Sequence, residues 1–254
     1  MEKQYHIGLG RNEVANYILL CGAPERAART SKLFDSIALE RKNREFLTFT
    51  GTYKKIPLTV MSTGIGPDNT EIAIVELCQI VEKPAFIRIG SCGALQKNIA
   101  LGDLIISTGA VRLENTSLFF VPEGYPAIAH YEIVNTLIEA AKELNYPYHV
   151  GLTATASGFY GAQARKIKGF GLRFPNLVKE LSAINVLNFE MESSTLFTLA
   201  SIRNLRAGTI CAVYAQRLRN EFIDDKAKEV SELKCINTGL KAVELLYKKD
   251  KRKK

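Results

Sequence analysis

Short runs of β-branched and aromatic residues alternate along the chain with longer stretches in which apolar residues recur at helical spacing. The short runs predict strands at 17–21, 46–53, 57–62, 85–89, 104–107, 149–156, 186–189 and 208–215. The longer stretches predict helices at 24–33, 69–81, 128–144, 191–203 and 226–247. Several strands are apolar on both faces, which is typical of a sheet covered by helices. We therefore expect a single three-layer α/β/α domain with a mixed central sheet.

No linker, repeat or low-complexity segment divides the 254 residues, so one domain is expected over residues 1–247. The last seven residues, 248–254, hold six basic side chains and one acidic one, which is +5 of the net charge of +8. We expect them to form a solvated basic tail. The rest of the chain then carries 8 − 5 = +3, and it shows no helix-turn-helix, RRM or zinc-finger pattern. A nucleic-acid partner is therefore not expected, although the net charge keeps that class of protein open. The irregular stretch 166–185 is expected to form a flap.

The cysteines and histidines indicate the cellular compartment and whether a metal site is expected. The five cysteines form no C-x-x-C pair and are expected to be reduced residues of the core. With the cysteines, the three histidines form no metal-binding pattern, so no metal is expected. No signal-like N-terminus and no run of about 18 apolar residues is present, so we expect a cytoplasmic protein with no membrane partner.

The first candidate site follows the first predicted strand, at residues 22–26 (Gly-Ala-Pro-Glu-Arg). Pro24 stands at the first helical position, so free N–H groups and the positive helix end face the space above the strand. That geometry suits phosphate, which the Arg26 guanidinium could bind bidentately. Taken alone, the segment favours an ordinary strand-to-helix turn with a solvated arginine.

A second candidate is Arg88, which lies inside an apolar strand that runs into a Gly-Ser-x-Gly turn. A buried arginine needs an anionic partner. Ser91 and the turn amides point to a small anion, but an internal salt bridge to Glu45 or Asp103 explains the arginine equally well. Arg44 could supply another positive group, although alone it is no more than a surface charge.

Two acidic residues flank Met191 where a predicted strand meets a helix. Carboxylates are natural acceptors for a vicinal diol, so Glu190 and Glu192 could hold a ribose. The simpler interpretation is that they stabilise the helix N-terminus, by about 0.3–1 kcal/mol each.

The loop at 159–165 combines an aromatic ring, an amide and a guanidinium in Phe159, Gln163 and Arg165. Together these groups can recognise the edge of a flat heterocycle. Plain surface loops contain such residues too, so the loop gains meaning only from the segments that accompany it.

Taken together, these segments resemble the nucleoside phosphorylase family of the hexameric type, and most closely its uridine phosphorylase branch. The resemblance runs from about His6 to the last helix. The matching strings lie at 5–9, 22–26, 44–46, 62–66, 88–91, 159–165 and 189–193. Any one string is weak, whereas seven in the family's order are specific.

The resemblance implies reversible phosphorolysis of uridine to uracil and ribose 1-phosphate. It also implies a homo-oligomer, a hexamer built as a trimer of dimers. Phosphate is then a co-substrate and no cofactor is expected. The implied phosphate site is Gly22, Arg26, Arg88 and Ser91, with Arg44 from a neighbouring subunit. The implied ribose site is Glu190, Met191 and Glu192, with His6 donated across the dimer interface. The implied base site is Phe159, Gln163, Arg165 and Arg217. Catalysis would fall to Arg26, Arg88, Gln163 and Arg165.

One stretch discriminates between bases. Purine-cleaving relatives carry an aspartate at the strand end, which protonates the purine N7, whereas residues 215–217 here read Ala-Gln-Arg. Uracil needs no such acid, because its carbonyl oxygens take up the developing negative charge. The resemblance therefore favours a pyrimidine. Tyr214 departs from the family's pattern, since it is bulkier than the aliphatic residue usual in that wall.

Other functions stay open at this point. A purine nucleoside or methylthioadenosine phosphorylase could find its acid elsewhere. A hydrolytic nucleosidase would have little use for the arginines and Ser91. A catalytically silent nucleoside-binding protein would carry the same recognition groups.

Overall fold

The computed structural model describes residues 3–253 and folds them into six α-helices, two 3-10 helices and eleven strands. The strands are β1 Tyr17–Cys21, β2 Ser36–Asn43, β3 Phe46–Tyr53, β4 Ile56–Ser62, β5 Ala85–Ala94, β6 Leu104–Leu113, β7 Ala127–Ile128, β8 Tyr148–Ala156, β9 Asn188–Glu190, β10 Arg206–Gln216 and β11 Glu221–Phe222. The helices are α1 Pro24–Ser31, α2 Pro67–Ile80, η1 Thr116–Phe119, α3 Tyr131–Glu143, η2 Gly161–Gln163, α4 Leu177–Ala183, α5 Ser193–Ile202 and α6 Asp225–Arg252.

All strands belong to one mixed sheet, which closes partly on itself. Its order is β11-β10-β6-β8-β9-β5-β1-β4-β3-β2, with β7 beside β6. Strand β10 also pairs in parallel with β5, so β5, β10, β6, β8 and β9 form a ring of paired strands. This closure brings the ends of β5, β9 and β10 together, and the site lies at these ends.

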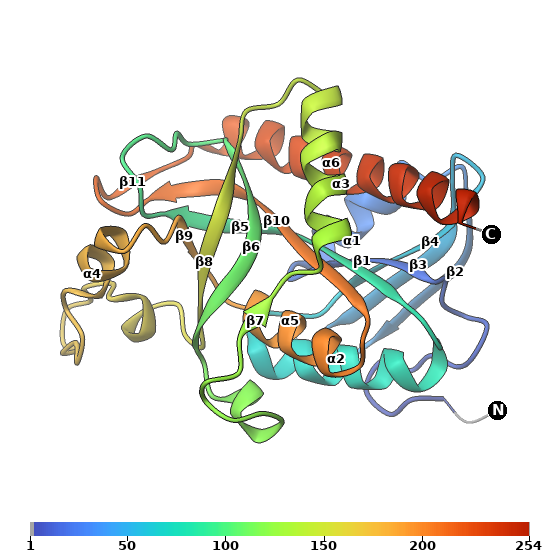
Figure 1. The fold of residues 1–254 in the computed structure, drawn as a ribbon, viewed down its shortest axis with the longest axis horizontal. Helices are drawn as coiled ribbons and strands as arrows, with labels where there is room; N and C mark the ends of the chain where they lie inside the picture. The colour runs from blue at the N-terminus through green and yellow to red at the C-terminus, as the bar shows by residue number, and fades with distance from the viewer. Residues whose placement is uncertain (1–2, 254) are drawn as a thin grey trace.

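Helices cover both faces of the sheet, as the sequence predicts. A Cβ at Gly208 in β10 would meet Ile133 of α3, whereas the next side chain, Thr209, accepts a hydrogen bond from Ser193 of α5. Because successive side chains of a strand point to opposite faces, α3 and α5 lie on opposite sides of β10. In Figure 1, α3 and α6 lie above the sheet and α2 and α5 below it. The three-layer α/β/α architecture is confirmed.

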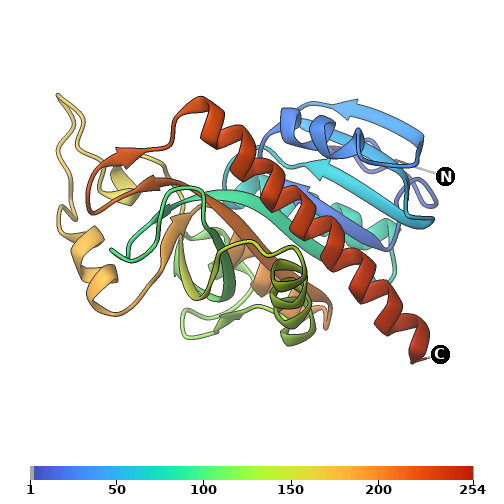
Figure 2. The same ribbon diagram turned by 90° about the horizontal axis from the view of Figure 1, so that it is seen from above.

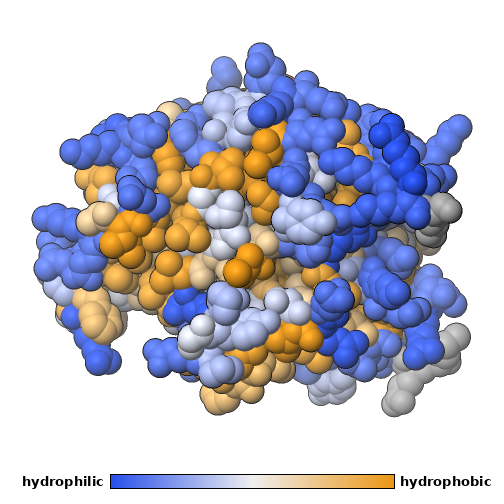
Figure 3. Space-filling view, in the orientation of Figure 1, coloured by the Kyte–Doolittle hydropathy of each residue, from blue (hydrophilic) through white to orange (hydrophobic). Residues whose placement is uncertain are grey.

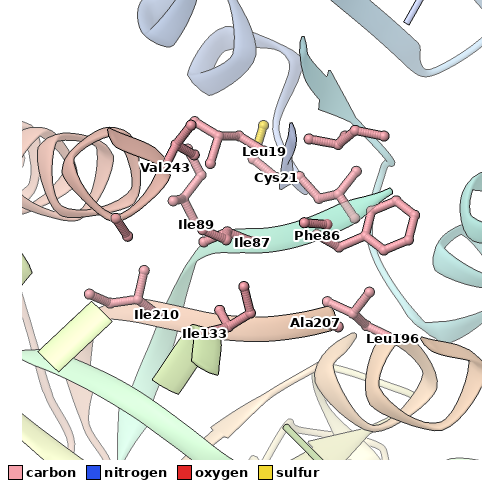
Figure 4. Close-up of a cluster of buried hydrophobic side chains, with 14 of the residues drawn as sticks. Leu19, Cys21, Phe86, Ile87, Ile89, Ile133, Leu196, Ala207, Ile210 and Val243 are labelled. Carbon is pink, nitrogen blue, oxygen red and sulfur yellow. The ribbon is translucent and has the colours of Figure 1, made fainter. Parts of the chain in front are cut away.

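The core lies where these layers meet. Figure 4 shows Leu19 and Ile89 of the central strands close to Val243 of α6, Ile87 on β5, and Ile210 and Ile133 beside the neighbouring strand β10. All of these side chains are almost completely buried, and burying each contributes about 1.5–3 kcal/mol. This packing holds the strand ends that carry the site.

The structure differs from the predicted elements in several places, and the short elements β7, β11, η1 and η2 were not predicted. Strand β2 was not predicted, because its three apolar residues stand together before three charged ones, without the alternation of a half-buried strand, and its side chains are mostly exposed at the sheet edge. Strands β5 and β6 continue through glycines that read as turns. Helix α4 lies inside the stretch 166–185, which was expected to be irregular throughout.

Helix α6 does not end at Tyr247 but continues to Arg252, through residues expected to form a solvated tail. Lys248 and Lys249 pair with Glu244 and Glu139 at 2.6 Å each, and Lys253 pairs with Glu132. Asp250, the one acidic residue of the segment, pairs with Arg206 at 2.7 Å. Two of the lysines therefore fasten the end of α6 to α3, and Asp250 fastens it to the start of β10.

The cysteines agree with a reduced core, since all five are free and four are buried. Among residues 3–253, no group of His, Cys, Asp or Glu side chains is placed to hold a metal ion. Within the same part of the chain, no helix combines the length and the apolar character needed to cross a membrane.

Candidate active site

One cavity of about 840 Å³ opens where β1, β5, β9 and β10 end. That volume lies within the range of small-molecule sites. Its lining includes the predicted residues Gly22, Arg26, Arg88, Ser91, Phe159, Gln163, Arg165, Glu190, Met191 and Glu192. Segments up to about 170 residues apart in the sequence are thus brought into one cavity.

Arg26 is buried in the first turn of α1, with 6% of its surface exposed. Its Nε donates to Glu232 at 2.9 Å, its Nη1 to the carbonyl of Ile89 at 3.2 Å and its Nη2 to the hydroxyl of Tyr214 at 3.3 Å. The solvated arginine that the isolated segment favours is therefore wrong. The side chain is fixed at the cavity wall, beside the turn that begins α1.

Arg88 is equally buried and pairs with the two carboxylates of the predicted ribose site. Its Nη2 donates to Glu192, and its Nε lies 3.8 Å from a carboxylate oxygen of Glu190. Neither Glu45 nor Asp103 is its partner; Asp103 instead contacts His149 at 2.8 Å. An internal ion pair is therefore present, but with partners that the sequence did not indicate.

The guanidinium of Arg88 lies along its own strand, toward position 90. It occupies the space that a side chain at position 90 would need, so a Cβ on Gly90 would collide with it. Burial alone would lower the pKa of Arg88, but Glu192, Cys211 and Glu190 together raise the pKa above its usual value. The arginine therefore stays charged inside the cavity wall.

The carboxylate of Glu190 binds backbone N–H groups at the start of α5 and also accepts a side-chain hydroxyl. It accepts the backbone N–H of Glu192 at 2.9 Å and that of Ser193 at 2.9 Å, and the hydroxyl of Thr155 donates to it. The interpretation as a helix N-terminus partner is thus correct for Glu190. Burial raises its pKa, and the charge of Arg88 opposes that shift. Glu192 accepts the N–H of Gly66 at 2.8 Å and links the ribose side of the cavity to the loop before α2.

Two arginines of a different kind lie beyond β9: Arg165 lines the cavity and Arg217 lies just behind its lining. Arg217 donates to the backbone carbonyl of Gln163 at 2.6 Å and lies 5.5 Å from the ring of Phe189. Arg165 lies over the ring of Phe159 at 4.0 Å, and its Nε is buried with no hydrogen-bond partner in residues 3–253. Burial, and then the charge of Arg165, lower the pKa of Arg217 to about 10.

Strand β9 lies between the two sides. Glu190 contacts Arg88, and the preceding residue, Phe189, packs against Arg217. An anion near Arg26 and Arg88 and a heterocycle near Gln163 and Arg165 would therefore meet at residues 190–192. This arrangement can hold an anion, a diol and a planar base in one row.

The family model of the phosphorylase superfamily matches residues 16–240 of the chain. The chain belongs to the phosphorylase superfamily. The match covers every strand from β1 to β11. The segments that line the cavity therefore lie within the matched part of this superfamily member.

Individual relatives of this superfamily member carry two kinds of name. The chain is 48% identical to uridine phosphorylase of Thermococcus kodakarensis, over 90% of this chain and 83% of that protein. It is 34% identical to guanosine phosphorylase of Halorubrum lacusprofundi, over 84% of this chain and 83% of that protein. The crystal structure of uridine phosphorylase from Vibrio fischeri superposes with a TM-score of 0.86 at 32% identity, over 95% of this chain and 97% of that chain.

Three predicted site residues of this superfamily member do not line its own cavity: His6, Arg44 and Arg217. Arg217 is one contact away, through Gln163. His6 binds Glu76 at 2.6 Å, and Arg44 lies 5.5 Å from the ring of Tyr5. His6 and Arg44 nevertheless lie close together, since Asn43 donates to the carbonyl of His6 at 2.7 Å.

Several lining residues of this superfamily member were not predicted as site residues, although some lay beside predicted ones. They include Glu45, Asn69, Cys92, Phe189, Tyr214 and Phe222. Glu45 adjoins Arg44, and Cys92 adjoins Ser91, so proximity in sequence is a signal for both. Nothing in the sequence indicates that Glu232 contacts Arg26, because it is one of many charged residues of α6.

Proposed function

We propose that the chain is a uridine phosphorylase that converts uridine and phosphate reversibly to uracil and ribose 1-phosphate. The observation that carries the proposal is the row of groups in one cavity: two arginines, two carboxylates, then the amide of Gln163 with Arg165, behind which Arg217 contacts Gln163. The identity to the Thermococcus kodakarensis uridine phosphorylase supports the same reaction. The enzyme would act as a pentosyltransferase in pyrimidine nucleoside salvage.

In this proposal phosphate binds against Arg26, Arg88 and Ser91, with the amides that follow Gly22. Glycosidic bond cleavage proceeds through an oxocarbenium-like state, and phosphate takes the place of the water in hydrolysis. The arginines orient the dianion below the anomeric carbon, and the dianion stabilises the ribosyl cation. The ribose hydroxyls are held by Glu190 and Glu192, with Met191 against the sugar.

The base side explains why uracil can leave without a general acid. Gln163 and Arg165 are donors to the uracil edge, Phe159 stacks on the base, and Arg217 fixes Gln163 from behind. Negative charge that develops on the uracil carbonyls meets two guanidinium groups with no carboxylate partner among the described residues. The strand end, the region where purine-cleaving relatives carry an acid, reads Ala-Gln-Arg at 215–217 here and has no carboxylate.

We further propose a homo-oligomer, a hexamer built as a trimer of dimers, in which His6 and Arg44 complete the cavity of a neighbouring subunit. Neither residue lines its own cavity and the two lie close together, which supports this arrangement. Apolar surface also crosses the middle of the face shown in Figure 3, and Ile128 of β7 and Val150 and Leu152 of β8 are exposed. Such surface is typical of an interface.

Phosphate is proposed as a co-substrate, with no cofactor. A cytoplasmic location is proposed because all five cysteines are free, which fits a reducing compartment.

A nucleoside panel with and without phosphate tests the reaction. We expect phosphate-dependent release of uracil from uridine, with little release of hypoxanthine, guanine or adenine. Cleavage that is independent of phosphate would indicate a nucleosidase, and binding of uridine without turnover would indicate a silent binding protein. Either result would refute the proposal.

A purine nucleoside phosphorylase is the second candidate, because a guanosine phosphorylase is among the relatives. The same panel decides between the two. Phosphorolysis of guanosine or inosine with uridine inert would replace our assignment.

Subunit complementation tests the shared site. Arg26→Ala keeps Arg44 intact for a partner but lacks its own phosphate arginine, whereas Arg44→Ala keeps its own cavity. If Arg44 acts in the neighbouring subunit, mixing the two inactive variants after dissociation restores about a quarter of the wild-type sites, since half of the random dimers are hybrids with one complete site. No recovery, with light scattering showing mixed oligomers, would place Arg44 outside the partner's site.

A further inference from the structure

The carboxylate of Glu232 lies behind the cavity wall, in the first half of α6, which runs diagonally across the sheet in Figure 2. It is 9% exposed and does not line the cavity. It accepts Arg26 Nε at 2.9 Å, Arg29 Nη1 at 2.6 Å and the hydroxyl of Tyr214 at 3.1 Å. One buried carboxylate thus joins α1, β10 and α6 at the proposed phosphate side.

Counting the N–H groups of Arg26 shows what this contact leaves free. A guanidinium carries five N–H donors in a rigid plane. Protein groups take three of them: Glu232 the one on Nε, the Ile89 carbonyl one on Nη1 and Tyr214 one on Nη2. One N–H remains on each terminal nitrogen, and two terminal N–H groups can bind a phosphate bidentately.

Tyr214 connects the carboxylate to the cavity. The register of β10 against β5 shifts between Val213 and Ala215, so Tyr214 sits at a bulge and its side chain is half-buried in the cavity wall. Its hydroxyl accepts from Arg26 at 3.3 Å and donates to Glu232 at 3.1 Å. Bulges commonly redirect a side chain beside a site.

We propose that Glu232 and Tyr214 are positioning residues that hold the Arg26 guanidinium with its two free N–H groups toward phosphate. The inference rests on the proposed function, and it assigns a task to two residues that do not react. Arginine is a flexible side chain, and a fork that is fixed in advance loses less freedom when it binds an anion. Arg88 differs, because its carboxylate partners face the ribose.

The contrary view is that Glu232 competes with phosphate for Arg26. The contact geometry separates the two, since Glu232 takes Nε and approaches from outside the cavity, whereas a competitor would take the terminal nitrogens. If Glu232 positions Arg26, its loss raises the KM for phosphate, whereas if it competes with phosphate, its loss lowers that KM.

The test measures steady-state kinetics and direct phosphate binding for Glu232→Gln and Tyr214→Phe. For Glu232→Gln we expect the KM for phosphate to rise about tenfold, a change of about 1.4 kcal/mol. The KM for uridine should stay within about twofold, because the base and ribose contacts are untouched. Tyr214→Phe, which removes only the hydroxyl, should raise the phosphate KM about threefold. The double variant should show less than the product, because both act through Arg26.

Two matched variants control for structural damage. Glu244→Gln removes another paired carboxylate of α6, one that contacts Lys54 and Lys248, and it should leave both KM values unchanged. Arg29→Gln removes a partner of Glu232 that does not line the cavity, and it should change the phosphate KM by less than twofold.

An unchanged or lower phosphate KM in Glu232→Gln and Tyr214→Phe would overturn the proposal, the lower value favouring competition. An equal rise in the KM for uridine and in the KM for phosphate would indicate general structural damage, and it would overturn the proposal too. Calorimetric titration with inorganic phosphate keeps this result separate from the proposed reaction. If the wild type binds phosphate but leaves uridine intact, uridine phosphorolysis fails, while the binding constants still judge the role of Glu232.

Discussion

The two sides of the cavity hold their arginines in contrasting ways. Arg26 and Arg88 each contact a buried carboxylate, whereas Arg165 and Arg217 pair with none in residues 3–253 and lie against aromatic rings. In the first pair, carboxylates hold the guanidinium groups in place and offset part of their charge. The second pair keeps its charge uncompensated.

The difference fits the chemistry proposed for each side. A phosphate dianion is present before and after the reaction, so its arginines benefit from a fixed frame. Charge on the base appears only as the glycosidic bond breaks, and unpaired guanidinium groups act most strongly on charge that develops in the transition state. Four experiments can break or sharpen this contrast.

The largest effect is expected from Arg88→Ala. It should lower kcat/KM by about 10³-fold, since an anion-binding donor is lost. It should also lower the free energy of unfolding by about 3–5 kcal/mol, because it leaves Glu190 and Glu192 buried and unpaired. Kinetics and denaturant titration measure both, and uridine binding should persist. The double variant Arg88→Ala/Glu192→Gln should recover stability without activity; recovered activity would contradict the role of Arg88.

Arg165→Ala should lower kcat/KM by about 10²-fold. Its effect on the free energy of unfolding should stay within about 1 kcal/mol, because no ion pair is broken. The same two measurements apply. A loss of stability as large as that of Arg88→Ala would erase the contrast between the two sides.

The pH profile should show the uncompensated charge directly. With a pKa of about 10, Arg217 is a cation below that pH and neutral above it. The kcat/KM, corrected for ionisation of the free base and nucleoside, should therefore fall above about pH 10. Arg165→Met removes the neighbouring charge and should move this limb to higher pH. A limb that stays in place would show that the two arginines do not interact.

The smallest effect is expected at an ion pair outside the cavity. Hydrogen bonds from Lys248 and Lys54 lower the pKa of Glu244 from 4.5 to about 2. The carboxylate therefore stabilises the fold above pH 4.5, and this contribution is lost as the pH falls toward 2. Glu244→Gln should cost less than about 1 kcal/mol at neutral pH and nothing near pH 2. Urea titrations across that range would contradict us if the difference persisted in acid.

The fold follows from the sequence where apolar periodicity is strong, as in β1 and in the first part of α6. The fold does not follow from the sequence where a residue is required by a close contact with another part of the chain. Gly93 reads as a turn, yet it lies within β5, where a Cβ would approach Arg217 to 3.0 Å. Sequence patterns describe each strand alone, so close approaches between strands escape them.

The site divides in the same way. Motifs in the family's order indicate ten residues that line the cavity, because short loops after strands keep their residues together. They do not indicate that Arg88 pairs with Glu192, which is 104 residues away, or that α6 supplies Glu232. Such pairs depend on the closure of the ring of strands, which no local pattern contains.

The position of Arg88 over Gly90 has a consequence for change in this chain. Because the Arg88 guanidinium and the Cys211 sulfur both fill the space above position 90, the three residues form one unit of substitution. A library that varies position 90 alone should return glycine, whereas larger residues there become acceptable only together with smaller side chains at 88 and 211. Engineers who wish to alter the anion that this cavity accepts would have to randomise the three positions at once.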